Sequence, residues 1–116
     1  MTDCLFCGIV AGDVPAEIVH RGERTVAFRD INPVAPVHVL VVPRRHIDNA
    51  AAVAPVDADD VVALITAARE VAEAEGIAEP DRGYRLVFNV GPDALNSVGH
   101  LHLHVIGGRT MTGSLG

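Results

Sequence analysis

Hydrophobic positions along the chain follow a helical period in two segments. Between residues 57 and 75 the apolar side chains form one stripe made of Val61, Leu64, Ile65, Ala68, Val71 and Ala72. Acidic residues open this segment, where they suit the helix dipole, and Gly76 closes it. Residues 3–11 show the same spacing over a shorter length, with Thr2 or Asp3 available as a cap. The pattern predicts one long helix and one short N-terminal helix.

Other apolar stretches are short and rich in β-branched residues, which predicts strands. They cover residues 18–20, 25–28, 38–42, 84–89 and 100–106. The run at 38–42 is almost entirely aliphatic, so we expect it inside the sheet, buried on more than one side. Several of the strands are joined by short loops, whereas parallel strands need long crossovers. The sequence therefore predicts an α+β fold with a five-stranded antiparallel sheet and the helices packed on one face.

Length and charge narrow the class of protein. A chain of 116 residues fits one domain, 1–116, with a single site. Its net charge is −6 and no run of Lys and Arg is interleaved with aromatics, so nucleic acid and anionic membrane are poor partners. The N-terminus does not look like a signal peptide, and no apolar run approaches the roughly 20 residues of a membrane helix. We expect a cytoplasmic protein.

Three histidines alternate with aliphatic residues near the C-terminus, at His100, His102 and His104. On a strand the two-residue period sends all three imidazoles to one face and the aliphatics to the other. A row of polar rings on a sheet face carries a considerable desolvation cost, which argues against a purely structural role. Two chemistries fit: alternate histidines as metal ligands, or one nucleophilic imidazole oriented by its neighbours. The spacing alone does not separate them.

The two cysteines, Cys4 and Cys7, are separated by two residues. They are too close for a comfortable disulfide in most backbones, and a reducing cytoplasm disfavours one. The pair is therefore either a pair of metal ligands or two ordinary thiols. Spacing of this kind arises often enough by chance that it does not by itself indicate a metal.

Taken together, several motifs resemble the histidine triad family, most closely its Hint branch, over nearly the whole chain. These motifs are the triad itself, Asn89 and Ser97 ahead of it, residues 30–33 leading to His38, and residues 43–47. The resemblance implies a nucleotide-binding hydrolase or transferase in which the middle histidine attacks the α-phosphate of a nucleoside phosphoramidate or related nucleotide conjugate. Water then releases the covalent nucleotidyl-histidine. By position, the attacking residue is His102.

The same resemblance implies roles for other side chains. His104 and the first triad residue, His100, complete the catalytic set, and Asn89 and Ser97 act as donors around the phosphate oxygens. Asp30 would accept a ribose hydroxyl, and His38 would face the same cavity, although a lone histidine could equally be structural. The expected walls of the base pocket are Phe6, Val14, Phe28, Ile31 and Leu40, for each of which ordinary core packing is an equally good explanation.

Several bacterial members of the family resemble this sequence in holding zinc with two N-terminal cysteines and two histidines, which here are Cys4, Cys7, His46 and His100. Two thiolates and two imidazoles form a closed tetrahedral set, typical of structural zinc. This site leaves His102 free to act as the nucleophile, whereas a catalytic metal on the triad would consume it. The resemblance therefore favours structural zinc, with no organic cofactor.

The family pattern also implies partners and exposes departures. The implied partners are a purine nucleotide or nucleoside phosphoramidate and a second copy of the chain, in a homodimer formed through sheet and helix. Leu95 and Asn96 stand where Hint proteins usually carry Gly-Gln, and residues 108–116 form a variable tail without the branch's Trp-Pro-Pro-Gly. Two rival functions stay open: a noncatalytic nucleotide- or zinc-binding module, and a metal-dependent hydrolase with the triad as ligands.

Overall fold

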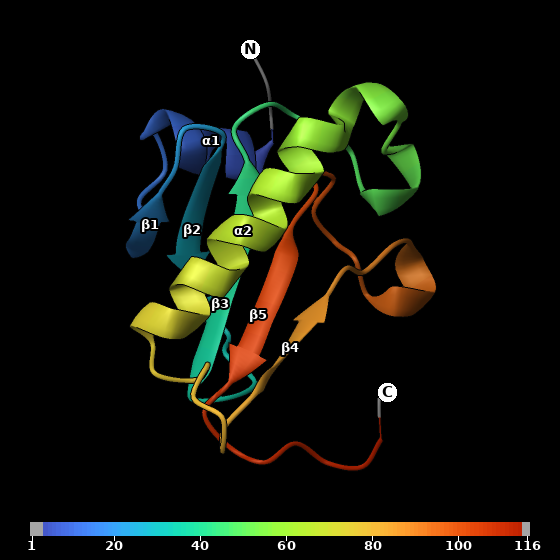
Figure 1. Cartoon of the computed structure of the whole chain (residues 1–116). Helices are drawn as coiled ribbons and strands as arrows, with labels where there is room; N and C mark the ends of the chain where they lie inside the picture. Colours follow the sequence, from blue (N-terminus) through green and yellow to red (C-terminus); the bar gives the residue numbers. More distant parts are fainter. Residues whose placement is uncertain (1–3, 115–116) are drawn as a thin grey trace.

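The computed structural model describes residues 4–114 and consists of a twisted five-stranded sheet with a helix on each face (Figure 1). Along the chain the elements are α1 (Leu5–Ala11), β1 (Ile18–Arg21), β2 (Thr25–Arg29), β3 (Val37–Pro43), α2 (Ala58–Ala74), β4 (Tyr84–Val87) and β5 (Leu103–Gly107). Three short 3-10 turns lie at Ala50–Ala52, Pro55–Asp57 and Pro92–Ala94. The α+β class and the five antiparallel strands are as predicted.

The sheet has the strand order β1-β2-β3-β5-β4, and every neighbouring pair is antiparallel. All residues of the central strand β3 are buried, as its aliphatic run predicted. The register pairs His104 of β5 with Leu40 of β3 on one side and with Val87 of β4 on the other. The middle of the sheet therefore carries the third triad histidine.

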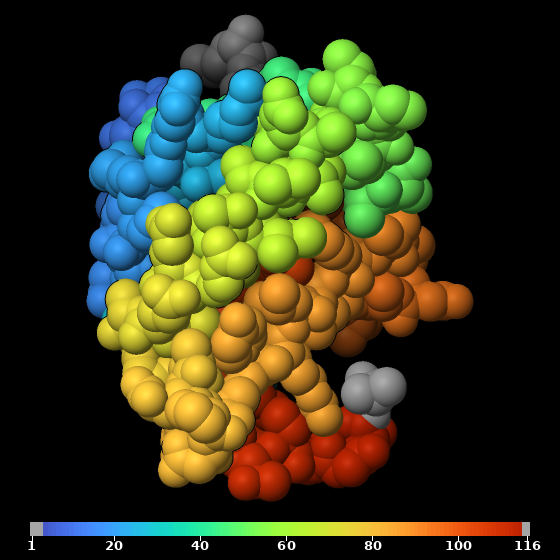
Figure 2. Space-filling model, in the orientation of Figure 1, coloured from blue at the N-terminus to red at the C-terminus, as the bar shows by residue number. Residues whose placement is uncertain are grey.

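Both faces of the sheet are covered, which corrects the expectation that the helices share one face. α2 packs over Val39 and Val41 of β3, whereas Phe6 and Ile9 of α1 pack with Leu40 and Val42, which point the opposite way. Because successive residues of a strand face opposite sides, a strand that is aliphatic throughout needs apolar cover on both. Figure 1 shows α2 lying diagonally across its face of the sheet, and in Figure 2 the same helix, in yellow-green, covers the molecule on that side.

Two element boundaries differ from the prediction in ways that affect the site. Strand β5 begins at Leu103, so His100 and His102 lie on the segment that leads into the ladder, with a bend at His100. The alternation nevertheless holds, because Leu101 and Leu103 both enter the core under α2. The cap of α1 is Cys4, whose Sγ accepts a hydrogen bond from the Cys7 backbone N–H at 3.3 Å. Thr2 and Asp3, proposed as caps from the sequence, lie outside the described residues.

No helix among residues 4–114 combines the length and apolar character required to cross a membrane.

Candidate functional site

A cavity of about 730 Å³ opens on the face of the sheet that α1 covers, a size typical of small-molecule sites. Its lining is Leu5, Phe6, Ile9, Val14, Pro15, Ala16, Phe28, Arg29, Asp30, Ile31, Asn32, Val34, His38, Leu40, Asn89, Leu95, Ser97, Val98, His102 and His104. Apolar side chains from α1, β2 and β3 form one part, and imidazoles, Asp30 and Asn89 form another. The cavity therefore offers an apolar slot that ends in a polar cluster.

The residues expected as walls of a base pocket all line this cavity. Phe6 and Phe28 meet edge to face with ring centroids 5.3 Å apart, and Phe6 also lies edge-on to His102 at 5.1 Å. Phe6, Phe28 and Leu40 are at most 5% exposed, whereas Ile31 is 89% exposed. The first three are thus both core and cavity wall, and Ile31 stands at the mouth.

The second triad histidine has a defined tautomer. Nδ1 of His102 lies 2.7 Å from the backbone carbonyl oxygen of His100. A carbonyl oxygen only accepts hydrogen bonds, so Nδ1 carries the proton and donates it. In the neutral imidazole the lone pair is then on Nε2. This nitrogen is free to act as a nucleophile or ligand.

His38 and His104 form a directed pair beside it. The Val34 backbone N–H donates to Nδ1 of His38 at 3.1 Å, which places the proton of a neutral His38 on Nε2. That Nε2–H donates in turn to Nδ1 of His104 at 2.9 Å. The proton of a neutral His104 therefore sits on its Nε2, which lies 3.4 Å from Nδ2 of Asn89. Both nitrogens carry N–H donors, so they do not bond each other and can both serve an acceptor in the cavity.

The environment keeps both of these rings uncharged at neutral pH. Burial first, and then the neighbouring His102 and His38, lower the pKa of His104 to about 4, while Asp30 acts in the opposite direction. Burial likewise lowers the pKa of His38, against the attraction of Asp30. An uncharged His104 can thus donate through Nε2 while it accepts through Nδ1.

Asp30 and Ser97 occupy the edges of the polar cluster. One carboxylate oxygen of Asp30 accepts the backbone N–H of Asn32 at 2.8 Å, and the other lies 3.4 Å from Nε2 of His38. Ser97 is exposed on the loop ahead of the triad and lines the cavity. Both side chains border the same space as His102 and His104.

The first triad histidine is oriented differently. His100 is fully buried and does not line the cavity; its Nδ1 lies 3.4 Å from Sγ of both Cys4 and Cys7. Nδ1 of His46 lies 3.3 Å from Sγ of Cys7. The ligand atoms of Cys4, Cys7, His46 and His100 all lie within 4.8 Å of one another. The four residues predicted as zinc ligands therefore form one cluster that could hold a metal ion.

The chemistry of this donor set suits zinc. Bond lengths of about 2.0–2.3 Å in a tetrahedron place neighbouring ligand atoms about 3.3–3.8 Å apart, close to the sulfur-to-nitrogen distances here. Nε2–H of His100 donates to the Pro43 carbonyl at 2.9 Å, and Nε2–H of His46 donates to the Asp48 carboxylate at 2.9 Å. Both imidazoles consequently turn an Nδ1 lone pair toward the sulfurs, the orientation that outer partners of metal ligands impose. Burial lowers the pKa of His100, which favours its neutral, ligating form.

A salt-bridge network fixes the chain beside His46. The guanidinium of Arg45 pairs with Asp57 and Asp60 at the start of α2, and both carboxylates are buried. The Ala54 backbone N–H and Arg45 hold the pKa of Asp57 below its usual value. The loop that presents His46 is thereby attached to the long helix.

The triad histidines do not form a metal site of their own in the part of the chain that the structure describes. His100 belongs to the cysteine cluster, and the other group that brings ligand atoms within 4.8 Å is Asp30, His38 and His104. His38 and His104 already hydrogen-bond each other, and His102 belongs to neither group. The geometry disfavours a catalytic metal on all three triad residues.

Sequence reasoning missed part of the lining. Ile9, Val34 and Val98 lack any chemical signal, because apolar residues look the same in a core and in a cavity. Arg85, in contrast, could have been identified. It shares a face of β4 with Val87, and both residues line a second cavity together with Asn89, His38 and His104. The two-residue period counted back from Asn89 would have indicated it.

Comparison with known proteins gives a consistent result. The HIT domain model matches residues 11–111. The chain is 37% identical over 109 residues to the purine nucleoside phosphoramidase of Escherichia coli (strain K12), and the aligned region covers 94% of this chain and 90% of that protein. A HIT family hydrolase from Clostridium thermocellum superimposes with a TM-score of 0.93 at 42% identity, over 99% of this chain and 98% of that one. A zinc-bound histidine triad family protein from Mycobacterium smegmatis matches with a TM-score of 0.79 at 30% identity, over 92% and 76%.

Proposed function

Because the chain belongs to the HIT domain family and is a homologue of a purine nucleoside phosphoramidase, we propose that it hydrolyses nucleoside phosphoramidates or related nucleotide conjugates through a nucleotidyl-His102 intermediate. The hydrogen bond from Nδ1 of His102 to the His100 carbonyl carries the proposal. It fixes the tautomer that leaves the Nε2 lone pair available at the cavity.

The reaction has two displacements at the α-phosphorus. First, Nε2 of His102 attacks phosphorus, the bond from phosphorus to the leaving group breaks, and the leaving nitrogen or oxygen takes a proton from the solvent. Water then attacks the same phosphorus and gives up a proton to the solvent, the bond to Nε2 breaks, and the nucleoside monophosphate departs with His102 restored. Holding the nucleotide beside Nε2 makes the first step effectively unimolecular.

Neighbouring groups support the charge that develops on the phosphate oxygens. The Nε2–H of His104 is a donor whose direction is set by His38, and the Asn89 amide lies next to it. We assign His104, Asn89 and Ser97 to the phosphate, since preoriented donors stabilise the transition state without reorganisation. Asp30 would accept a ribose hydroxyl, and the slot around Phe6, Phe28 and Leu40 would hold a purine, with Val14 and Ile31 nearer its mouth.

We further propose that Cys4, Cys7, His46 and His100 hold structural zinc. When bound, this ion would join α1, the loop after β3 and the segment before β5, without an open coordination position for substrate. His100 then has two separate tasks in the protein. Its side chain holds the metal, and its backbone carbonyl orients His102.

We propose a homodimer as the working form. Strand β4 is an edge of the sheet and carries Leu86, which is 40% exposed, while Val62 and Ile65 of α2 are also exposed. An edge strand and exposed apolar helix positions are both features that suit pairing with a second copy. Light scattering coupled to size exclusion should give twice the mass of the chain; the mass of one chain would contradict the dimer.

One observation keeps a binding module as the alternative. Leu95 has φ 60°, a left-handed conformation that a glycine adopts freely, and it lies beside Ser97 at the cavity. A rigid, bulky residue here could block the leaving group while leaving nucleotide binding intact. Stoichiometric binding of adenosine 5′-phosphoramidate with no product would favour this alternative.

Steady-state hydrolysis of adenosine 5′-phosphoramidate tests the proposal. Removal of the nucleophile in His102→Ala should reduce kcat/KM by about a thousandfold or more. His20→Ala is the matched control, because His20 lies on β1 away from the cavity and should retain activity. Activity that survives in His102→Ala would contradict the covalent mechanism.

A further inference from the structure

A second cavity adjoins the polar cluster on the side away from the apolar slot. It has a volume of about 620 Å³ and is bounded by His38, Asn89 and His104 on one side and by Arg85, Arg109 and Met111 on another. In Figure 2 a hollow is visible between β4, in orange, and the C-terminal segment, in red. Two arginines therefore line the space beside the assigned phosphate donors.

The sheet register explains how Arg85 reaches this space. On the β4–β5 ladder Val87 pairs with His104 and Arg85 pairs with Ile106, one step further along the same face. Residues two apart on a strand are separated by about 7 Å. Arg85 therefore stands next to the triad histidine that we assign to the phosphate.

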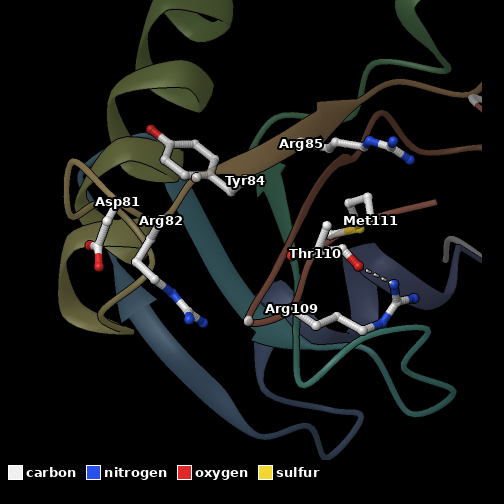
Figure 3. Close-up of a pocket in the computed structure, with 9 residues that line it drawn as sticks. Asp81, Arg82, Tyr84, Arg85, Arg109, Thr110 and Met111 are labelled. Atoms are coloured by element: carbon white, nitrogen blue, oxygen red, sulfur yellow. Dashed lines mark hydrogen bonds between the residues drawn. The ribbon is translucent and has the colours of Figure 1, made fainter. Parts of the chain in front are cut away.

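Both guanidinium groups are positioned by the backbone and keep donors to spare. Arg109 donates to the Val34 carbonyl at 2.9 Å and the Thr110 carbonyl at 3.1 Å, and Arg85 donates to the Thr112 carbonyl at 3.0 Å. A guanidinium has five N–H donors, so most of those on Arg85 are left for a ligand. Figure 3 shows the Arg85 and Arg109 side chains extending in the same direction, away from Asp81 and Arg82.

Neither charge is neutralised by a carboxylate within residues 4–114, although the protein is acidic overall. Arg24, Arg29 and Arg45 all form ion pairs, whereas Arg85 and Arg109 form none there. Asp81 and Arg82 border a smaller neighbouring cavity together with these arginines, but they do not line the one that contains His104. Two cations that have no carboxylate partner among the described residues, beside a phosphate site, attract an anion.

We propose that Arg85 and Arg109 form a leaving-group subsite for an anion, so that the preferred substrates are nucleotide conjugates whose leaving group carries a phosphate or a carboxylate. The inference rests on the proposed function in one respect, because it takes the α-phosphate to lie at His102 and His104. The subsite selects the leaving group and leaves the choice of base to the apolar slot.

Binding separates this inference from turnover. Isothermal titration of the full chain compares adenosine 5′-(α,β-methylene)diphosphate, which resists hydrolysis, with the methyl ester of adenosine monophosphate. We expect the diphosphate analogue to bind about tenfold more tightly or better, as charged hydrogen bonds of this kind allow. The ratio of the two affinities should fall toward one in Arg85→Gln and fall in part in Arg109→Gln and Arg85→Lys. It should persist in Arg82→Gln, which removes an equal charge outside the cavity.

Kinetics distinguishes the two kinds of anion. Adenosine 5′-phosphoramidates of β-alanine and of propylamine have leaving groups of similar size that differ by a carboxylate. If kcat/KM is higher for the β-alanine conjugate and Arg85→Gln removes the difference, the subsite also accepts carboxylates. If the β-alanine conjugate is not preferred but the diphosphate analogue still binds more tightly, the subsite accepts phosphates only. Equal affinities and equal rates in both pairs, or preferences that Arg85→Gln leaves intact, would overturn the inference.

The two proposals can fail separately. If no phosphoramidate is turned over but the diphosphate analogue binds with the expected dependence on Arg85, the hydrolase proposal fails and the anion subsite stands. If His102-dependent turnover occurs without any preference for an anionic leaving group, the hydrolase stands and the subsite fails.

Discussion

The backbone carbonyl of His100 accepts a hydrogen bond from Nδ1 of His102 across 2.7 Å, while the His100 side chain turns toward Cys4 and Cys7. The backbone carbonyl and the side chain of His100 therefore contact different partners. One residue of the triad thereby connects a cluster suited to metal with the residue that we propose as nucleophile. The metal site and the catalytic site are separate in chemistry but share one stretch of backbone.

Removal of metal should destabilise the protein. The cluster exists as a set of four ligands only in the folded chain, so bound zinc adds to the free energy of unfolding by mass action. At a free zinc concentration a few hundred times the dissociation constant this contribution is about 3 kcal/mol. We expect about one zinc per chain by mass spectrometry of the metal, and a lower midpoint of thermal unfolding after dialysis against a chelator.

Variants of the cluster check that prediction. Cys4→Ser and Cys7→Ser should lower both zinc content and stability, whereas His20→Ala, which removes a histidine outside the cluster, should retain the metal. Full zinc content in both cysteine variants would show that the metal is bound elsewhere.

Stability should fall as the pH drops below about 6.5, in part because of His104. Its pKa is about 4 in the folded protein against about 6.5 in the unfolded chain, so the unfolded chain binds more protons between these values. The free energy of unfolding therefore rises with pH across this window and is flat above it. This group contributes at most about 3 kcal/mol. Burial of the ring is the main cause of the effect, and the facing groups His102, His38 and Asp30 modify it.

Denaturant unfolding of the wild type and His104→Gln from pH 4 to pH 8 isolates this contribution. The variant should show a shallower pH dependence, although His38 and His100 have lowered pKa values and keep part of the slope. Asp57 titrates below the window, because its pKa is lowered from 3.8. Identical slopes for the two proteins would contradict the assignment to His104.

Leu95 should be a point of backbone strain. Its φ of 60° is unfavourable for a side chain with a Cβ, and it is 87% exposed, so little burial compensates. Leu95→Gly should be more stable than Leu95→Ala by about 1 kcal/mol, because alanine retains the strain that glycine removes. Chemical denaturation of the two variants measures the difference. Equal stabilities would mean that the loop relaxes without strain.

The fold was largely predictable because the spacing of hydrophobic residues along the chain distinguishes its helices from its strands. The stripe between residues 57 and 75 predicted α2, and the aliphatic run of β3 predicted a central strand. The prediction failed where tertiary cover decides the outcome. α1 lies on the face opposite α2 because β3 is apolar on both sides and needs cover on each. The apolar stripe of α1 shows that this helix is buried, but it does not show against which face of the sheet.

The candidate site was predictable to a different degree for different kinds of residue. The alternation of the histidines indicated the triad, whereas the cluster of Cys4, Cys7, His46 and His100 was implied by the resemblance to the histidine triad family and not by the spacing of the cysteines. The alternation alone could not indicate which way the His100 ring points, since that depends on a hydrogen bond to Pro43 on a strand distant in the sequence. Arg109 was missed because an arginine after a strand is usually a solvated charge.

Rapid-quench intact-mass spectrometry with adenosine 5′-phosphoramidate tests the nucleotidyl-histidine mechanism most directly, provided that the quench is not acidic, because the phosphorus–nitrogen bond is labile in acid. The account predicts an adenylyl adduct on the wild type and on His20→Ala, and none on His102→Ala or His102→Gly. An adduct that persists without His102 would place the nucleophile elsewhere. Turnover by the wild type with no adduct at any time would contradict the covalent mechanism.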